Sequence, residues 1–460
     1  MKHTNGTRRS MLLLTGILAA TPVFAQQKTG PGVPSDDSLT WYGITLYGVI
    51  DAGIQYDTHS APFSPYRPAA SGNIVRSNDY GSPVGITPSN MGQSRVGLQG
   101  NEHLVGDFSG VFQIESFFNP QSGQLADSLR SLSANNGKAV TRQNIGVDGS
   151  SAGQAFQTAF VGFKSPTFGA LTFGRQVTLL SEGAIQYDPN FLSTAFGVLG
   201  ASNTYAGAGS SETNRLDDTV KYLLKVGAVH FGAQYKFNDS SGSARTAYFA
   251  NLGGSLAGAS LDAFYSKIND SVTASALSAA QVAALPALGF PAGNSLAATI
   301  ADVTSYAFMA SYRFDPVRVF AGYEHIKYDD PGTPLSAGYT DIGDYVLAFV
   351  TNNAYVDPKQ VQVYWTGVRY TVVRGLDLTA AYYHVHQDAY GTGTQAGCST
   401  TAHGTCSGSL EGISFDADYR FNVHFDVYAG AMYSGVHDGM ASGYLYSTNI
   451  NPTIGARYKF

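Results

Sequence analysis

The chain of 460 residues has little charge and few cysteines. Charged residues make up 13% of it, about half of the ~25% that is usual in soluble proteins. Two cysteines are too few for a disulfide-built scaffold, and an aromatic content of 12% with so little charge excludes a disordered chain. After residue 25 the sequence contains no uninterrupted run of ~18 apolar residues, so a bundle of membrane-spanning helices is excluded as well.

Glycine, tyrosine and phenylalanine are abundant, with 53, 29 and 26 copies. Together with the exclusions above, this composition favours a large all-β protein, of which a membrane barrel is one form. The length corresponds to about three ordinary domains at ~150 residues each, but single barrels often exceed that size. Because no break in composition divides the chain, we expect one domain over residues 26–460.

The N-terminus has the three parts of a secretory signal peptide. Lys2, Arg8 and Arg9 form a basic region, an apolar region follows from Met11 to Ala20, and residues 23–25 form a small-residue cleavage site. We therefore expect a signal peptide over residues 1–25 and an exported mature chain.

The export route and the charge of the mature chain follow from the same segment. Residues 7–12 also resemble a twin-arginine signal, but that route exports folded proteins, and a membrane barrel is expected to fold after export. Removal of residues 1–25 takes away three positive charges, so 24 basic residues face 33 acidic ones and the net charge becomes −9. An acidic exported protein is a poor candidate for nucleic-acid binding, which requires a basic surface.

Apolar and polar residues alternate with a period of two, the pattern of a half-buried β-strand. Near the start of the mature chain, Ile50 and Ile54 share one face and Asp51 and Gln55 share the other. The same alternation recurs up to Phe460. Many apolar faces are built from small residues and tyrosine, which suits lipid better than a tightly packed core.

Short and long connections between these strands alternate along the chain. Short turns fall near 104–110, 165–170, 226–230, 253–259, 314–317, 373–375 and 422–424, and longer polar segments near 57–92, 119–153, 179–214, 240–244, 271–301, 331–358, 387–409 and 438–449. Seven short and eight long connections join sixteen strands, and an even count with short turns on one side is typical of outer-membrane barrels. The Ala-rich segment 271–301 is interpreted as a loop insertion in which Pro286 and Pro291 would interrupt any helix.

Several segments resemble the Gram-negative general diffusion porins. They are Thr-Leu-Tyr-Gly-Val-Ile-Asp at 45–51, Ser-Arg-Val-Gly-Leu-Gln-Gly at 94–100, Phe-Gly-Ala-Leu-Thr-Phe-Gly-Arg-Gln at 168–176, Thr-Val-Lys-Tyr at 219–222 and Gly-Ala-Arg-Tyr-Lys-Phe at 455–460. The resemblance implies a transmembrane antiparallel barrel of sixteen strands, short periplasmic turns and long outer loops, with the third loop folded inward as a constriction. It also implies a homotrimer in outer-membrane lipid and lipopolysaccharide, with no cofactor. The aromatic Phe460 would be the C-terminal signal for the barrel-assembly machinery.

The sequence departs from the family at one wall position. Where relatives often carry Arg-Gln-x-Tyr-Val-Gly, this chain has Phe-Gln-Thr-Ala-Phe-Val-Gly at 156–162. Phe156 thus replaces an expected wall arginine, and the set of wall arginines would be thinner than in a typical relative.

Charged residues that point into such a barrel are the candidate site, because rings of charge select ions in narrow pores. Alternation points Arg95 and Lys221 inward, whereas Arg175 shares the face of outward Phe173 and needs a bulge at Gly174 to point inward, as the family implies. Arg215 begins the next strand and completes the basic set. The acidic candidates are Asp51, Glu115, Glu182 and Asp188, with Glu212, Asp217 and Asp218 near the end of the third loop. The alternative for each charged residue is that it has no specific function, because the lumen and the loops are in contact with water and tolerate charge.

Other clusters support weaker interpretations. Cys398 and Cys406 lie eight residues apart in a polar segment, and an oxidising compartment favours a disulfide between them over two free thiols. His384 and His386, followed by Asp388, could bind a metal, but they fit an aromatic belt at the outer rim better, so no metal is expected. The sequence contains no nucleophile elbow, phosphate loop or zinc-protease motif, so an enzyme is not expected.

The sequence therefore predicts a passive channel for ions and small hydrophilic solutes in the outer membrane. A substrate-specific channel on the same fold and a soluble exported β-sandwich, adhesive or enzymatic, are the alternatives. The sign of the ion preference stays open, because the acidic net charge and the arginine cluster favour opposite signs.

Overall fold

The structure is a computed structural model that describes residues 39–66, 75, 81–139, 142–143, 155–202, 214–238, 246–291, 293–294, 296–339, 346–391 and 403–460. The predicted signal peptide over residues 1–25, Glu212 and Cys398 lie outside the described residues.

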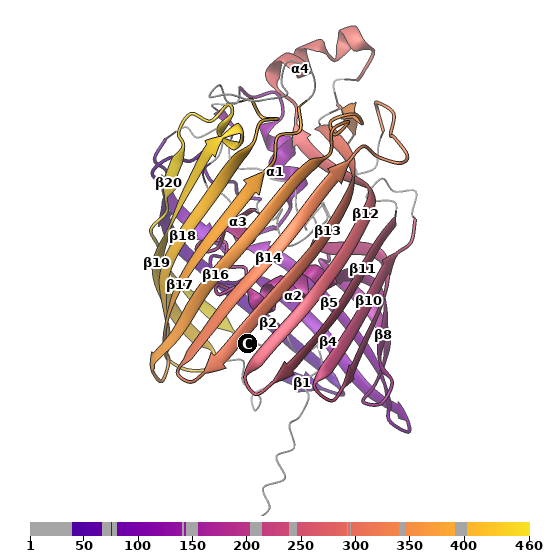
Figure 1. The fold of residues 1–460 in the computed structure, drawn as a ribbon, viewed down its shortest axis with the longest axis vertical. Coiled ribbons are helices and arrows are strands. Elements are labelled where there is room, and N and C mark those ends of the chain that lie inside the picture. Colours follow the sequence, from indigo (N-terminus) through magenta and orange to yellow (C-terminus); the bar gives the residue numbers. More distant parts are fainter. Residues whose placement is uncertain are drawn as a thin grey trace, which may run out of the picture.

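Sixteen long strands form a closed antiparallel barrel within this part of the chain (Figure 1). They are β2 (Ile44–Tyr56), β4 (Arg95–Val105), β5 (Phe108–Asn119), β7 (Thr158–Ser165), β8 (Gly169–Val177), β9 (Arg215–Val226), β10 (Val229–Lys236), β11 (Thr246–Leu256), β12 (Ala259–Ala276), β13 (Leu296–Phe314), β14 (Val317–Asp329), β16 (Lys359–Val373), β17 (Leu376–Gln387), β18 (Gly408–Arg420), β19 (Phe425–Asp438) and β21 (Thr453–Lys459). Each pairs with the next in this order, and the last pairs with the first. The predicted strand number is confirmed.

Shorter elements lie in the connections or, for β1, just before the first barrel strand. The strands are β1 (Leu39–Trp41), β3 (Val84–Pro88), β6 (Gln124–Leu125), β15 (Leu347–Thr351) and β20 (Thr448–Ile450), and the helices are α1 (Ser128–Asn135), α2 (Leu179–Tyr187), α3 (Val198–Ser202) and α4 (Ala279–Ala284). Two 3-10 turns, η3 (Pro286–Leu288) and η5 (Gly439–Ala441), complete the set. No helix among the described residues is long and apolar enough to cross a membrane.

The seam between the first and last barrel strands is closed by the C-terminal residue. Phe460 donates its backbone N–H to the carbonyl of Gly48 at 3.1 Å, and Gly48 donates back to the carbonyl of Phe460 at 3.0 Å. Glycine is required at position 48, since a β-carbon there would overlap the ring of Phe460. The end of the chain is thus part of the barrel wall.

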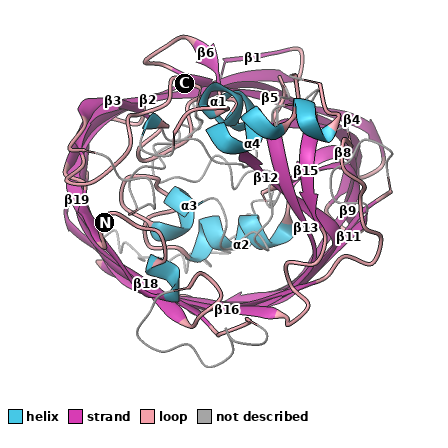
Figure 2. Ribbon diagram, turned by 90° about the horizontal axis from the view of Figure 1, so that it is seen from above, coloured by secondary structure: helices cyan, strands magenta, loops and turns pink. Residues whose placement is uncertain are grey.

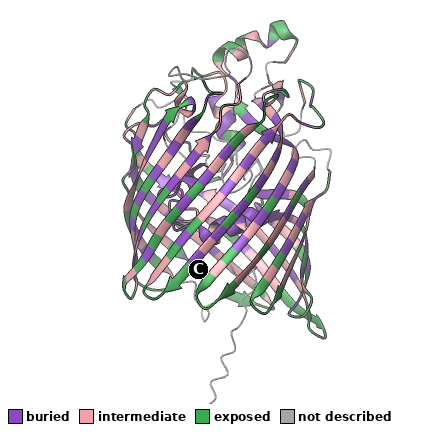
Figure 3. Cartoon of the chain, viewed as in Figure 1, coloured by how far each residue is buried: buried purple, intermediate pink, exposed green. Residues whose placement is uncertain are grey.

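Burial alternates along much of strands such as β2, β5, β13, β17 and β18, as the stripes in Figure 3 show. Ile50 and Ile54 are exposed on the outside of β2, whereas Asp51 and Gln55 are buried inside. The predicted two faces are therefore correct. All seven predicted short turns join consecutive strands at the lower end in Figure 1.

The loop predicted over 271–301 is longer than the connection in the structure, because strands extend into it from both sides. Strand β12 continues to Ala276 and β13 begins at Leu296, and Val272 and Thr273 pair with Ile300 and Thr299 beyond a register shift after Ile268. The pairing continues because the small and β-branched residues on both sides suit a strand. Within the shortened connection, α4 starts at a capping box and ends just before Pro286, so the predicted interruption by this proline is correct.

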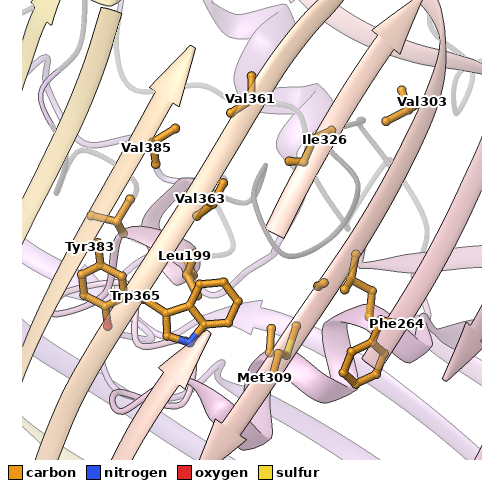
Figure 4. Packing of buried hydrophobic residues seen from close by; sticks show 14 of the residues in the cluster. Leu199, Phe264, Val303, Met309, Ile326, Val361, Val363, Trp365, Tyr383 and Val385 are labelled. Atoms are coloured by element: carbon orange, nitrogen blue, oxygen red, sulfur yellow. The ribbon is translucent and has the colours of Figure 1, made fainter. Parts of the chain in front are cut away.

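The third long connection lies inside the barrel. Figure 2 shows α2 and α3 within the ring of strands. Leu199 of α3 lies near Trp365 and Tyr383 of the wall in Figure 4, and all three belong to one buried apolar cluster. The inner wall from β11 to β19 therefore carries apolar side chains where this connection, 178–202, packs against it. We call residues 178–202 the inner loop.

Candidate functional site: charged groups inside the barrel

Three strands bring charged and phenolic groups to the buried carboxylate of Glu115 on β5. Arg95 on β4 places Nε 3.2 Å from Glu115 Oε2, and Arg215 on β9 places Nη2 3.9 Å from Oε1. Tyr47 on β2 donates its hydroxyl to Glu115 Oε2 at 3.0 Å. Two arginines thus share one carboxylate, while the guanidinium of Arg215 also lies 4.5 Å above the ring of Phe117.

Arg175 belongs to the same region because β8 has a bulge. The register between β8 and β9 shifts between Gly174 and Gln176, and Gly174 has φ of 128°. The bulge turns Arg175 inward, where its Nη1 lies 2.5 Å from Asp217 Oδ1. The inward position of Arg175 that the family resemblance implied is therefore present, by the bulge that the sequence suggested at Gly174.

Lys221 on β9 ties the inner loop to the wall. Its ammonium lies 2.8 Å from Glu182 Oε1 of α2 and donates to the carbonyl of Val177. Glu182 lies on α2, directly after β8, and its partner Lys221 lies on the neighbouring strand β9. The ion pair therefore forms on the side of the barrel from which the inner loop starts, and it does not cross the lumen.

Asp188 and Asp51 point inward but are fully buried. Asp188, at the end of α2, accepts a hydrogen bond from the Tyr383 hydroxyl at 2.7 Å and another from the Leu192 N–H at 2.7 Å. Burial raises the pKa of this carboxyl to about 6, against the lowering effect of the Tyr383 bond. Asp51 accepts from the backbone N–H groups of Met91 and Gly92. Both carboxylates anchor loop segments, and neither reaches water in the lumen.

A second group of inward cations lies toward the turn end of the wall that β16 to β21 form. Arg369 on β16 donates to the carbonyl of Pro189 in the inner loop at 2.9 Å. Its neighbours form ion pairs along the wall: Arg420 with Asp377, Arg457 with Asp418 and Asp426, and Lys459 with Asp426. Our sequence prediction missed this group, although Arg420, Arg457 and Lys459 alternate with outward aromatic residues, which was the available signal.

The remaining predicted residues lie away from this region. Phe156 precedes β7 and is exposed. Cys406 is in a disulfide, while Cys398, the chain's second cysteine, lies outside the described residues. His384 and His386 face outward and pair with Glu411 and Asp388. Within the described ranges, no group of three or more metal-binding side chains is placed to hold an ion.

An apolar outer face and a charged inner face on a closed sheet of sixteen strands define a class of protein. Outward Ile54, Phe163, Leu252 and Phe415 are exposed, whereas the inward charges described above form ion pairs or hydrogen bonds and are partly or fully buried. Such a closed barrel leaves no unpaired strand edge and can therefore lie in lipid. The protein is a transmembrane β-barrel of the outer-membrane type.

Comparison with known sequences identifies the family. The model of the Gram-negative porins matches residues 12–439, so the chain belongs to this family. An outer membrane porin protein of Bordetella pertussis is 30% identical over 197 residues, which cover 42% of this chain and 43% of that protein. The match thus spans less than half the length of this relative. Family and fold indicate an outer-membrane channel rather than an enzyme.

Solved structures share the fold. The anion-selective porin from Comamonas acidovorans has a TM-score of 0.57 at 15% identity, over 91% of this chain and 99% of that structure. OmpT of Vibrio cholerae, solved in a trimer form, has a TM-score of 0.54 at 16% identity, over 91% and 99%. At this level of identity the likeness shows the architecture alone.

Proposed function

We propose that the barrel forms a water-filled channel for passive diffusion of ions and small hydrophilic solutes, without catalysis and without a cofactor. One observation carries the proposal: charged side chains inside a closed barrel keep part of their surface open to solvent. The exposed fraction is 19% for Arg95, 27% for Asp217 and 25% for Glu182. Charge inside an apolar shell is stable only where water or a counter-charge reaches it.

The narrow region of this channel would lie between the inner loop and the charged part of the wall on β4, β5, β8 and β9. The apolar side of the inner loop packs against the other part of the wall, β11 to β19. We assign the charge of this region to Arg95, Arg175, Arg215, Lys221, Glu115 and Glu182. Three arginines there face Glu115 and Asp217, which leaves one positive charge in excess. Because the narrowest point sets the barrier, this excess favours anions locally despite the acidic mature chain.

The functional unit is proposed to be a homotrimer in outer-membrane lipid. The trimer form of OmpT, which shares this fold, supports that oligomeric state. The place of Phe460 in the closing seam supports its role in assembly, because loss of this residue removes two hydrogen bonds of the seam. The outward tyrosines and histidines near the loop end suit contact with lipopolysaccharide head groups.

Reconstitution tests this function directly. Purified protein in a planar lipid bilayer should give stepwise conductance in potassium chloride, and a salt gradient should give a reversal potential of anionic sign. In a gel without boiling, the folded barrel should migrate anomalously, and boiling should abolish the shift. Recovery of the protein without detergent, with no heat-dependent shift and no conductance, would instead favour the soluble β-sandwich.

A further inference from the structure

At the loop end of the barrel the ammonium of Lys359 lies over the rings of two tyrosines, and a third tyrosine packs against both of these rings. Lys359 Nζ lies 5.5 Å from the ring centroid of Tyr328 and 5.5 Å from that of Tyr390. The ring of Tyr355 lies 5.4 Å from Tyr328 and 6.0 Å from Tyr390. We call these four residues the rim cluster.

The rim cluster belongs to the inner face of the wall. Lys359 is the first residue of β16 and pairs in register with Tyr328, near the end of β14. Lys359 shares its face with the buried Val361, and Tyr328 shares its face with the buried Ile326. Both residues therefore face the lumen at its mouth, at the upper ends of β14 and β16 in Figure 1.

Backbone hydrogen bonds hold the other two tyrosines in position. Tyr355 donates its N–H to Asp330 Oδ1 at 3.0 Å, and Tyr390 donates its N–H to the carbonyl of Thr405 at 2.9 Å. The rings of Tyr355 and Tyr390 are half-buried. One ring from strand β14 and two rings from the connections after β15 and β17 are thus held in position before any solute arrives, which lowers the entropy cost of binding.

Lys359 differs from the inward Lys221 and Lys459 in its partners. Lys221 pairs with Glu182 and Lys459 with Asp426, whereas Lys359 forms no ion pair with a carboxylate of the described residues. Its ammonium interacts with ring faces, an attraction that leaves the positive charge uncompensated. A half-buried cation of this kind can accept an anion from solution.

We propose that the rim cluster is a capture site for small aromatic carboxylates at the mouth of the channel, an inference that rests on the proposed function. The solute carboxylate binds the Lys359 ammonium by a charge-assisted hydrogen bond, and its planar ring packs against the ring of Tyr355 or Tyr390. An acetate ion offers the charge without the ring, and benzamide offers the ring without the charge. The site therefore selects solutes that carry both.

Weak capture at the mouth is useful to a channel. Conduction requires binding that is favourable enough to collect the solute and weak enough to release it. Once released inward, the carboxylate meets the arginines of the proposed constriction, Arg95, Arg175 and Arg215, so the positive groups form successive positions along the path.

Benzoate is the probe for this proposal. In single-channel recordings, benzoate added from the loop side should interrupt the chloride current in a concentration-dependent way, and acetate and benzamide should do so only at much higher concentration. In Lys359→Met the half-blocking concentration of benzoate should rise about tenfold, the factor that 1.4 kcal/mol represents. Tyr355→Leu should raise it by a similar factor, and Tyr355→Phe, which keeps the ring, should not.

Lys327→Met is the matched control, because Lys327 lies on the outward face of the same rim and pairs with Asp329. Calorimetric titration of benzoate into the folded barrel in detergent separates the two proposals. Benzoate binding that depends on Lys359 in a protein without conductance would overturn the channel and keep the site. Normal conductance with equal block by benzoate and acetate, or block unchanged in Lys359→Met, would overturn the site and keep the channel.

Discussion

Arg175 Nη1 lies 2.5 Å from Asp217 Oδ1, although regular alternation would place Arg175 on the lipid side of β8 with Phe173. The bulge between Gly174 and Gln176 moves it to the inside. A β-carbon at position 174 would overlap the carbonyl of Ala159 in the neighbouring strand. The inward charge of Arg175 therefore depends on a glycine that carries no charge itself.

Gly174→Ala should imitate the loss of the Arg175 charge. Alanine at a φ of 128° costs about 1–3 kcal/mol of strain, and the overlap with the neighbouring strand adds to this. The strand is expected to straighten, which removes Arg175 from Asp217. The reversal potential in a salt gradient should then shift in the same direction as in Arg175→Ala.

The control for this prediction is Gly81→Ala, because a β-carbon at position 81 meets no atom within 4 Å. Gly81→Ala should keep the wild-type reversal potential. A wild-type potential in folded Gly174→Ala would show that the bulge does not depend on this glycine.

Arg95→Ala should shift the ion preference toward cations. Of the two arginines that share Glu115, the substitution leaves only Arg215, whose Nη2 lies 3.9 Å from Glu115 Oε1. One charge at ~4 Å in water is worth ~1 kcal/mol, which corresponds to about a fivefold change in the permeability ratio. Reversal potentials measure the ratio. Arg313→Ala, an exposed arginine beside a short turn, should leave it unchanged, and an unchanged ratio in Arg95→Ala would remove Arg95 from the constriction.

The sequence predicted the barrel well because strand alternation is a local property. The faces of Ile50 and Asp51 follow from a period of two, and this period holds wherever the strand is regular. At Arg175 the period gives the wrong face, and only the glycine before it indicates the bulge. The local alternation therefore predicts which residues of a regular strand face inward, and at Arg175 the preceding glycine marks the bulge where this rule fails.

The interior was harder to predict, because its contacts join residues far apart in the sequence. Asp188 looked like a lumen acid, but Tyr383, 195 positions later, covers it and donates a hydrogen bond. Val363 and Trp365 on β16 form an apolar inner wall, whereas a polar lumen is the usual pattern. The reason is that α3 packs there, and no pattern within β16 indicates this partner.

Asp57 should make the folded barrel less stable as the pH rises. This carboxyl follows β2 at the loop end, and burial raises its pKa to about 7 although Asn449 and Gln55 donate to it. The folded state binds the proton more tightly than the unfolded state, so this stabilisation is complete below pH ~4 and is lost as the pH rises through ~7. Urea unfolding in detergent should show a loss on the order of 2 kcal/mol between pH 5 and pH 8 from this group.

Asp57→Asn separates this group from the rest of the pH dependence. The side-chain amides of Gln55 and Asn449 can turn to bond an asparagine, so the variant should fold and should lose this part of the slope. The same change at exposed Asp357 is the control and should keep the wild-type slope. A wild-type slope in Asp57→Asn would assign the pH dependence to other carboxyls.

Leu199→Ala should loosen the inner loop without changing any charge. Leu199 is 2% exposed and packs in the apolar cluster with Trp365 and Tyr383 of the wall. Loss of such a buried side chain costs about 2–5 kcal/mol. Here it should weaken the packing of the inner loop against the wall. Single-channel records should show more frequent changes between conductance levels at an unchanged reversal potential. Leu252→Ala, on the outward face, is the control, and quiet records from folded Leu199→Ala would mean that polar anchors such as Asp188 hold the loop alone.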